Sequence, residues 1–95
     1  MHVVLRTWPD AKIVEVLLQH KGEVERLMKE IPGFSLWHLL RFTDGTCGTA
    51  TVCRDKAGCD RSMELAREWV AKNAPDIDVS RMQARDAEVL SEILA

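Results

Sequence analysis

The hydrophobic positions in the first third of the chain predict a strand followed by a helix. Residues 2–8 are rich in β-branched and aromatic side chains, and Pro9 ends the strand because proline cannot continue a paired strand. Apolar side chains then recur with helical period over residues 11–31. This pattern predicts one amphipathic helix with His20 in its apolar stripe, ended by Pro32 and Gly33.

The next residues alternate between two faces and predict a β-hairpin. Asp44-Gly45 is a strong signal for a two-residue turn between residues 34–42 and 47–54. Such a turn sets the register. It places Trp37 opposite Val52, and it places His38 opposite Thr51 on the face that meets the helices.

A second helix is predicted from residue 59 or 60 to Asn73, where Ala74-Pro75 ends it. Residues 76–83 are expected to be irregular. For residues 86–95, local propensity favours a short helix and topology favours a closing strand, and both alternatives stay open. The order is that of an α+β, ferredoxin-like β-α-β-β-α-β domain over residues 1–95, an antiparallel sheet with two helices on one face.

The other face of this sheet would be bare in a monomer. The predicted register puts apolar side chains on it, which favours a homodimer whose two sheets face each other. We expect the dimer interface to contain Trp37, Leu39, Arg41 and Val52.

Charge and composition exclude several classes of protein. The 95 residues carry 13 Lys and Arg against 15 Asp and Glu, a net charge of −2, which argues against nucleic-acid binding. No apolar run is long enough to cross a membrane, and no secretion signal is seen, so we expect a cytoplasmic protein. The spacing of Cys47, Cys53 and Cys59 matches no zinc or redox motif. Three free thiols, no metal and no cofactor are expected.

Two histidines are the candidate catalytic residues. If the helix stripe meets the apolar face of the hairpin, His20 and His38 would point into one cleft, where imidazoles could accept a substrate proton. The alternative is that each is a hydrogen-bonded structural histidine. A ligand site there needs a cavity on the order of 300 Å³. The other candidate ligand-binding residues are Arg6, Cys53, Trp69 and Asn73. Arg6 could hold a carboxylate or enolate, or pair with an acid across the dimer interface.

Several segments resemble the antibiotic-biosynthesis-monooxygenase-like (ABM-like) family of dimeric α+β barrels. They are VLRTW at 4–8, IPGF at 31–34, the Asp44-Gly45 turn, VCRDKAG at 52–58, Ser62 and EWV at 68–70, within residues 2–74. The resemblance implies a homodimer with one cleft in each subunit. Its relatives oxygenate aromatic polyketides or quinols without metal or flavin, degrade haem, or bind ligands.

The sequence departs from the catalytic branches of that family. The second helix offers Trp69 and Asn73 but not the histidine of the haem-degrading branch, and the chain has no tyrosine. No catalytic set is therefore carried over. The sequence predicts a protein that binds a small apolar or aromatic molecule, and the resemblance implies cofactor-independent monooxygenation of a quinol-type compound. The alternative is a ligand-binding or structural dimer without catalytic activity.

Overall fold

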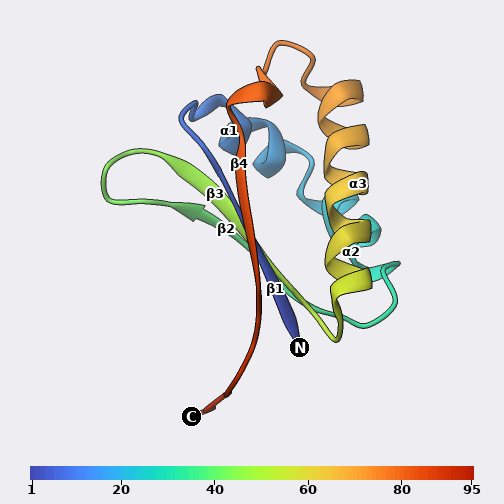
Figure 1. The fold of residues 1–95 in the computed structure, drawn as a ribbon. Coiled ribbons are helices and arrows are strands. Elements are labelled where there is room, and N and C mark those ends of the chain that lie inside the picture. The colour runs from blue at the N-terminus through green and yellow to red at the C-terminus, as the bar shows by residue number, and fades with distance from the viewer.

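Four strands form one antiparallel sheet in the order β2-β3-β1-β4, and the helices cover one of its faces (Figure 1). A computed structural model describes residues 1–95. This arrangement confirms the predicted α+β, ferredoxin-like fold. The elements are β1 (His2–Trp8), α1 (Lys12–Gln19), α2 (Lys21–Lys29), β2 (Phe34–Arg41), β3 (Cys47–Cys53), α3 (Lys56–Asn73), the short 3-10 helix η1 (Val79–Arg81) and β4 (Gln83–Glu88).

The first helical segment is two helices, whereas the sequence pattern predicted one. His20 ends α1 and begins α2, with φ −109° and ψ 25°, outside the helical region. Gly22 follows in the first turn of α2, and its low helix propensity favours a break at this place. The break removes His20 from a continuous apolar stripe.

The β2–β3 turn is one residue longer than predicted. The backbone N–H of Phe42 donates to the carbonyl of Thr46 at 2.8 Å, and that of Gly45 donates to the carbonyl of Phe42 at 3.0 Å. The loop is therefore residues 43–45. Gly45 has φ +90°, as a three-residue hairpin requires at its last position. The prediction of a two-residue turn is wrong.

This difference reverses the faces of β2. Trp37 pairs with Thr51 and His38 with Ala50, one residue away from the predicted register. A one-residue slip moves every side chain of a strand to the opposite face. Trp37 and Leu39 therefore pack against the core on the helix side.

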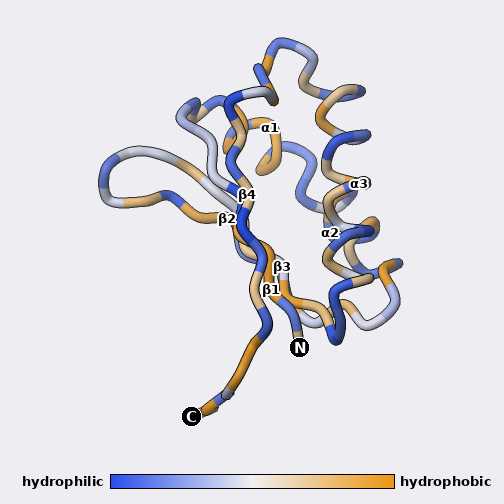
Figure 2. The backbone as a smooth tube through the Cα atoms, viewed as in Figure 1, coloured by the Kyte–Doolittle hydropathy of each residue, from blue (hydrophilic) through white to orange (hydrophobic).

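The C-terminal segment contains the closing strand that topology favoured. β4 pairs antiparallel with β1, and the N–H of Val89 extends the pairing to the carbonyl of Met1 at 2.9 Å. β4 begins at Gln83, inside the segment expected to be irregular. The chain beyond residue 89 runs away from the sheet, and its apolar residues Leu90, Ile93 and Leu94 are exposed (Figures 1 and 2).

The hydrophobic core lies between the helices and the sheet. Arg6, between Val4 and Trp8 on β1, faces this core, as do Thr49 and Thr51 on β3. No helix of the chain combines the length and apolarity that a membrane span requires. The buried apolar residues are Val4, Trp8, Ile13, Val14, Leu17, Val24, Met28, Ile31, Cys47, Cys53, Cys59, Trp69, Val70, Ala74 and Ile77.

Candidate functional site

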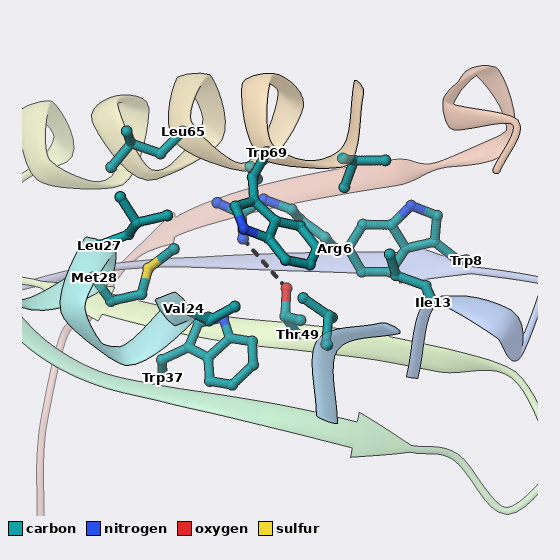
Figure 3. A pocket seen from close by; sticks show the side chains of 13 residues that line it. Arg6, Trp8, Ile13, Val24, Leu27, Met28, Trp37, Thr49, Leu65 and Trp69 are labelled. Carbon is teal, nitrogen blue, oxygen red and sulfur yellow. Dashed lines mark hydrogen bonds between the residues drawn. The ribbon is translucent and has the colours of Figure 1, made fainter. Parts of the chain in front are cut away.

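A small apolar cavity lies between the sheet and the helices (Figure 3). Its volume is about 40 Å³, and 11 of its 13 lining residues are hydrophobic. All three tryptophans of the chain line it, Trp8 from β1, Trp37 from β2 and Trp69 from α3. The lining residues are Arg6, Trp8, Ile13, Leu17, Val24, Leu27, Met28, Trp37, Thr49, Leu65, Ala66, Trp69 and Val70.

Arg6 is the one charged residue in this lining, and it is 1% exposed. Its guanidinium is held by neutral groups. Nη1 donates to Oγ1 of Thr49 at 3.2 Å, the bond drawn in Figure 3, and to Oγ1 of Thr51 at 3.4 Å. Nη2 donates to Oγ of Ser62 at 2.7 Å, and Nε donates to Sδ of Met63 at 2.8 Å. Two strands and α3 thus fix the position of the guanidinium.

The hydroxyl of Ser62 is oriented by a second bond. It donates to the carbonyl of Cys59 at 2.6 Å, so its oxygen lone pairs are left to accept from Arg6. The thioether of Met63 is a weaker acceptor than a hydroxyl. The guanidinium therefore has one strong anchor on α3 and one weak acceptor beside it.

No carboxylate compensates the charge of Arg6. The arginine ion pairs of the chain are Arg54–Asp55 and Arg61–Glu64, both outside the core. Burial lowers the pKa of the Arg6 guanidinium to about 10, so the group still carries its charge at neutral pH. A buried charge without a counter-charge is costly, and proteins normally pair it.

Two further buried hydrogen-bond donors have no acceptor. The indole Nε1 atoms of Trp8 and Trp69 are buried and make no hydrogen bond. Buried indole N–H groups usually find a partner.

The cavity is smaller than the sequence analysis expected. Its 40 Å³ is enough for a few water molecules. It is well below the roughly 300 Å³ of an ordinary ligand pocket. An aromatic ring can enter only if wall side chains move. Leu27, Trp37 and Leu65 are half-buried members of the lining.

The structure does not bring the two predicted histidines together. His20 lies outside the cavity lining and packs its ring edge-on against Trp69, with centroids 5.4 Å apart and planes at 76°. Its Nδ1 is 3.4 Å from a carboxylate oxygen of Glu23. His38 is exposed and lies on the opposite face of the sheet from Trp37. The predicted cleft with two imidazoles is wrong, because the hairpin register differs by one residue.

The predicted ligand-binding residues divide into two groups. Arg6 and Trp69 line the cavity, and their role in binding stays a prediction. Asn73 instead donates from Nδ2 to the carbonyl of Trp69 at 3.0 Å, within the last turn of α3. Cys53 is fully buried outside the lining, and burial raises the pKa of its thiol to about 11.

The predicted dimer-interface residues also divide. Val52 alternates with the buried residues of β3 that face the helices. It is itself half-buried, so it lies on the open face as expected. Trp37 and Leu39 pack against the core, and their placement on the open face was wrong. Arg41 is exposed at the end of β2, opposite Cys47. In the observed register the β2 residues of the open face include Leu36 and His38.

Sequence reasoning missed the groups that hold the guanidinium. Thr49 and Thr51 are polar residues on the core face of β3, opposite the strand that carries Arg6. Ser62 lies on the buried side of α3. The signal was present, since polar residues recur at alternate positions on a strand face that meets the helices. It could be interpreted only once the pairing register was known.

Comparison with known proteins shows the fold of the chain. No protein-family model matches the sequence, and no curated protein matches it. A solved protein of unknown function from Nitrosomonas europaea is similar with a TM-score of 0.69 and 20% identity, over 99% of this chain and 92% of that chain. A monooxygenase from Streptomyces coelicolor, solved in complex with the ligand Nanaomycin D, is similar with a TM-score of 0.64 and 21% identity, over 99% of this chain and 91% of that chain. The chain has the ferredoxin-like α+β fold that these two solved proteins share.

Proposed function

We propose that the protein binds a small, flat, largely apolar molecule in the cavity between sheet and helices. The observation that carries this proposal is the convergence of all three tryptophans on one apolar cavity. Indole rings offer large flat surfaces that suit aromatic ligands. Met28 lines the cavity, and its unbranched side chain can adopt other rotamers, which would admit a ring.

Oxygenation of a quinol-type compound without a cofactor is the activity to test at this site. It is supported by the monooxygenase that shares the fold. The cavity lining contains no histidine, carboxylate or tyrosine, so none of its residues is an obvious general base at neutral pH. The substrate would therefore react as an anion that forms without a protein base, and oxygen uptake should rise with pH.

Binding without catalysis is the alternative, and it is supported by the absence of histidine, carboxylate and tyrosine side chains from the cavity lining. A protein that only stores or senses a ligand needs the tryptophans and the apolar wall but no oxygen chemistry. The two functions differ in one measurement. Both predict binding of an aromatic molecule, and only the first predicts oxygen consumption in the presence of that molecule.

We also propose that two copies pair through the open face of the sheet. Leu5, Ala50 and Val52 lie on that face, and Leu36 at its edge is 39% exposed. A second copy of the same face would cover these apolar groups. Sedimentation velocity at micromolar concentration should give a dimer, and Val52→Asp should give a folded monomer. A monomeric wild-type protein would contradict the dimer.

The binding proposal is tested by tryptophan fluorescence with a panel of naphthols, hydroquinones and anthrone-type phenols. Ala66 lines the cavity, and Ala66→Leu should fill it and abolish quenching. Ala71 is exposed on the same helix, so Ala71→Leu is the matched control and should leave quenching unchanged. Equal quenching in wild type and Ala66→Leu would show that the ligand binds elsewhere. Oxygen uptake measured on the same samples separates catalysis from binding.

A further inference from the structure

We infer that residues 89–95 of one copy bind in a groove along the free edge of β2 in a second copy, where they cover the outer side of Trp37. The inference goes beyond the proposed pairing through the open face, because it concerns a different surface of the chain. It follows from an apolar segment that has no partner and from a groove that matches it in chemistry.

The C-terminal segment presents apolar side chains to solvent. The pairing of β4 with β1 ends where the N–H of Val89 donates to the carbonyl of Met1. Beyond this point the chain runs away from the sheet (Figures 1 and 2), and Leu90, Ile93 and Leu94 are 88%, 93% and 78% exposed. Apolar side chains that gather in the open on one short segment mark an interaction surface.

A groove along β2 is the surface that matches this segment. β2 is an edge strand in the order β2-β3-β1-β4, so one side of its backbone has no partner strand. Two hollows of about 370 Å³ each follow this strand, one beside α2 and one beside α1. Lys21 and Trp37 belong to both hollows, so the two adjoin and are called here the β2 groove. Leu18 and Leu36 are its exposed apolar side chains.

The two surfaces carry opposite charges. Glu88 and Glu92 are the charged residues between positions 88 and 95, and neither makes an ion pair. Lys21 in the β2 groove is also without an ion pair, whereas Lys29 at its rim is paired with Glu25 at 3.0 Å. An extended segment that brings Glu92 beside Lys21 would join two unpaired charges, which gives the contact its register.

The segment is poorly placed to fill the groove of its own chain. Glu88, His2, Cys53 and Phe34 form one row across the sheet, with β4 at one edge and β2 at the other. Neighbouring strands are about 4.8 Å apart, so about 14 Å separates β4 from β2. Residues 89–95 span about 23 Å when extended, and crossing the end of the sheet would leave about three of them to lie along β2. A second copy has no such constraint, and a free strand edge accepts an extended segment through main-chain hydrogen bonds.

The contact would extend the wall of the cavity between sheet and helices. Trp37 is half-buried and lines both the cavity and the β2 groove. Met28 and Leu17 also line the cavity and one hollow of the groove each. A segment bound in the groove would therefore cover the outer side of the cavity wall, and the second copy would contribute to the proposed ligand site.

The first test removes the apolar contacts. Leu90→Ser/Ile93→Ser changes two exposed side chains, so the fold should be retained. Sedimentation velocity should show a rise of at least about thirtyfold in the dissociation constant of the dimer. Val79→Ser is the matched control, since Val79 is exposed on η1 outside the β2 groove, and it should leave the constant unchanged. An unchanged constant in the double variant would show that the inference is wrong.

The second test asks whether the contact joins two copies. Glu92→Lys and Lys21→Glu should each raise the dissociation constant about fivefold to thirtyfold, because each variant creates two like-charge contacts in a dimer. An equal mixture of the two variants should restore association, since each copy then meets the opposite charge in its partner. Lys72→Glu, at an exposed site outside the groove, is the control and should have no effect. A mixture that associates as weakly as each variant alone would contradict the exchange between copies.

The indole signal of Trp37 separates this contact from pairing through the open face. In the wild type it should shift as protein concentration rises and the dimer forms, and in Leu90→Ser/Ile93→Ser it should stay in place. If the wild type and the double variant dimerise equally and the Trp37 signal stays fixed in both, the inference is wrong and the open-face pairing stands. If the wild type is monomeric at micromolar concentration, both are wrong.

Discussion

The hydroxyl oxygen of Ser62 lies 2.7 Å from Nη2 of Arg6, and this hydrogen bond links β1 to α3. Because both groups are buried, Ser62→Ala would leave part of the guanidinium without an acceptor. We expect the free energy of unfolding to fall by about 1–3 kcal/mol, measured by urea denaturation. Ser91→Ala, in the exposed C-terminal segment, is the control and should change it by less than about 0.5 kcal/mol. Equal effects would show that the Arg6–Ser62 bond adds nothing to stability.

Replacing two glycines by alanine should change stability in opposite directions, because their backbone conformations differ. Gly45 has φ +90°, so Gly45→Ala forces a side chain into the left-handed region and should destabilise by about 1 kcal/mol although there is space for it. Gly22 is helical, and a Cβ there would meet only Nη1 of Arg26 at 4.0 Å, so Gly22→Ala should stabilise by about 0.5–1 kcal/mol. Thermal unfolding of the two variants measures both effects. A stabilising Gly45→Ala would contradict the three-residue turn.

Acid should weaken the pairing of β4 with β1 through Asp86. The hydrogen bond from His2 is the main cause that lowers the pKa of this carboxyl below its ordinary value, with Lys56 assisting. A carboxyl with a depressed folded pKa adds stability above its unfolded pKa of about 3.9, and that stability is lost as the pH falls through the lower folded value. Wild type should therefore lose more stability below about pH 4 than Asp86→Asn does. Urea midpoints between pH 2 and 6 measure the difference, and Asp76→Asn in an exposed loop is the control. If the urea midpoints of wild type and Asp86→Asn change with pH in the same way, Asp86 does not contribute to the acid sensitivity.

The histidines should not be required for binding. His38→Ala should leave ligand affinity unchanged, because the side chain lies on the open face of the sheet and does not line the cavity. His20→Ala removes the edge contact with Trp69 and should cost up to about 1 kcal/mol of stability, with a change in ligand affinity of less than tenfold. Fluorescence titration of both variants checks this. Loss of binding in His38→Ala would contradict the observed hairpin register.

Local sequence signals predicted the order of the elements but not the faces of one strand. The pattern of β1, the break at Pro32-Gly33 and the Asp44-Gly45 turn were enough to predict a ferredoxin-like domain. The length of the turn was not, because Asp-Gly suits both a two-residue turn and the end of a three-residue one. That one residue decided whether Trp37 or His38 faced the core.

The hydrogen-bond cluster around Arg6 could not be predicted from the sequence because its members come from distant segments. Arg6, Thr49 and Ser62 meet only when β1 pairs with β3 and α3 packs across both. Each of them alone is an ordinary polar residue in a strand or helix. The closing strand was similarly a matter of topology, since β4 is exposed along its whole length and has no apolar alternation to mark it.

The central claim is that the cavity between sheet and helices is the ligand site, and the indole N–H resonances of the three tryptophans test it most directly. Trp8, Trp37 and Trp69 give one ¹H–¹⁵N indole signal each, and all three side chains line the cavity. Titration with a naphthol from the fluorescence panel should shift all three indole signals, because all three rings line the cavity. The shifts should be absent in Ala66→Leu. A titration that shifts backbone signals of Leu36, His38 and Val52 on the open face, and leaves the indole signals in place, would contradict the claim.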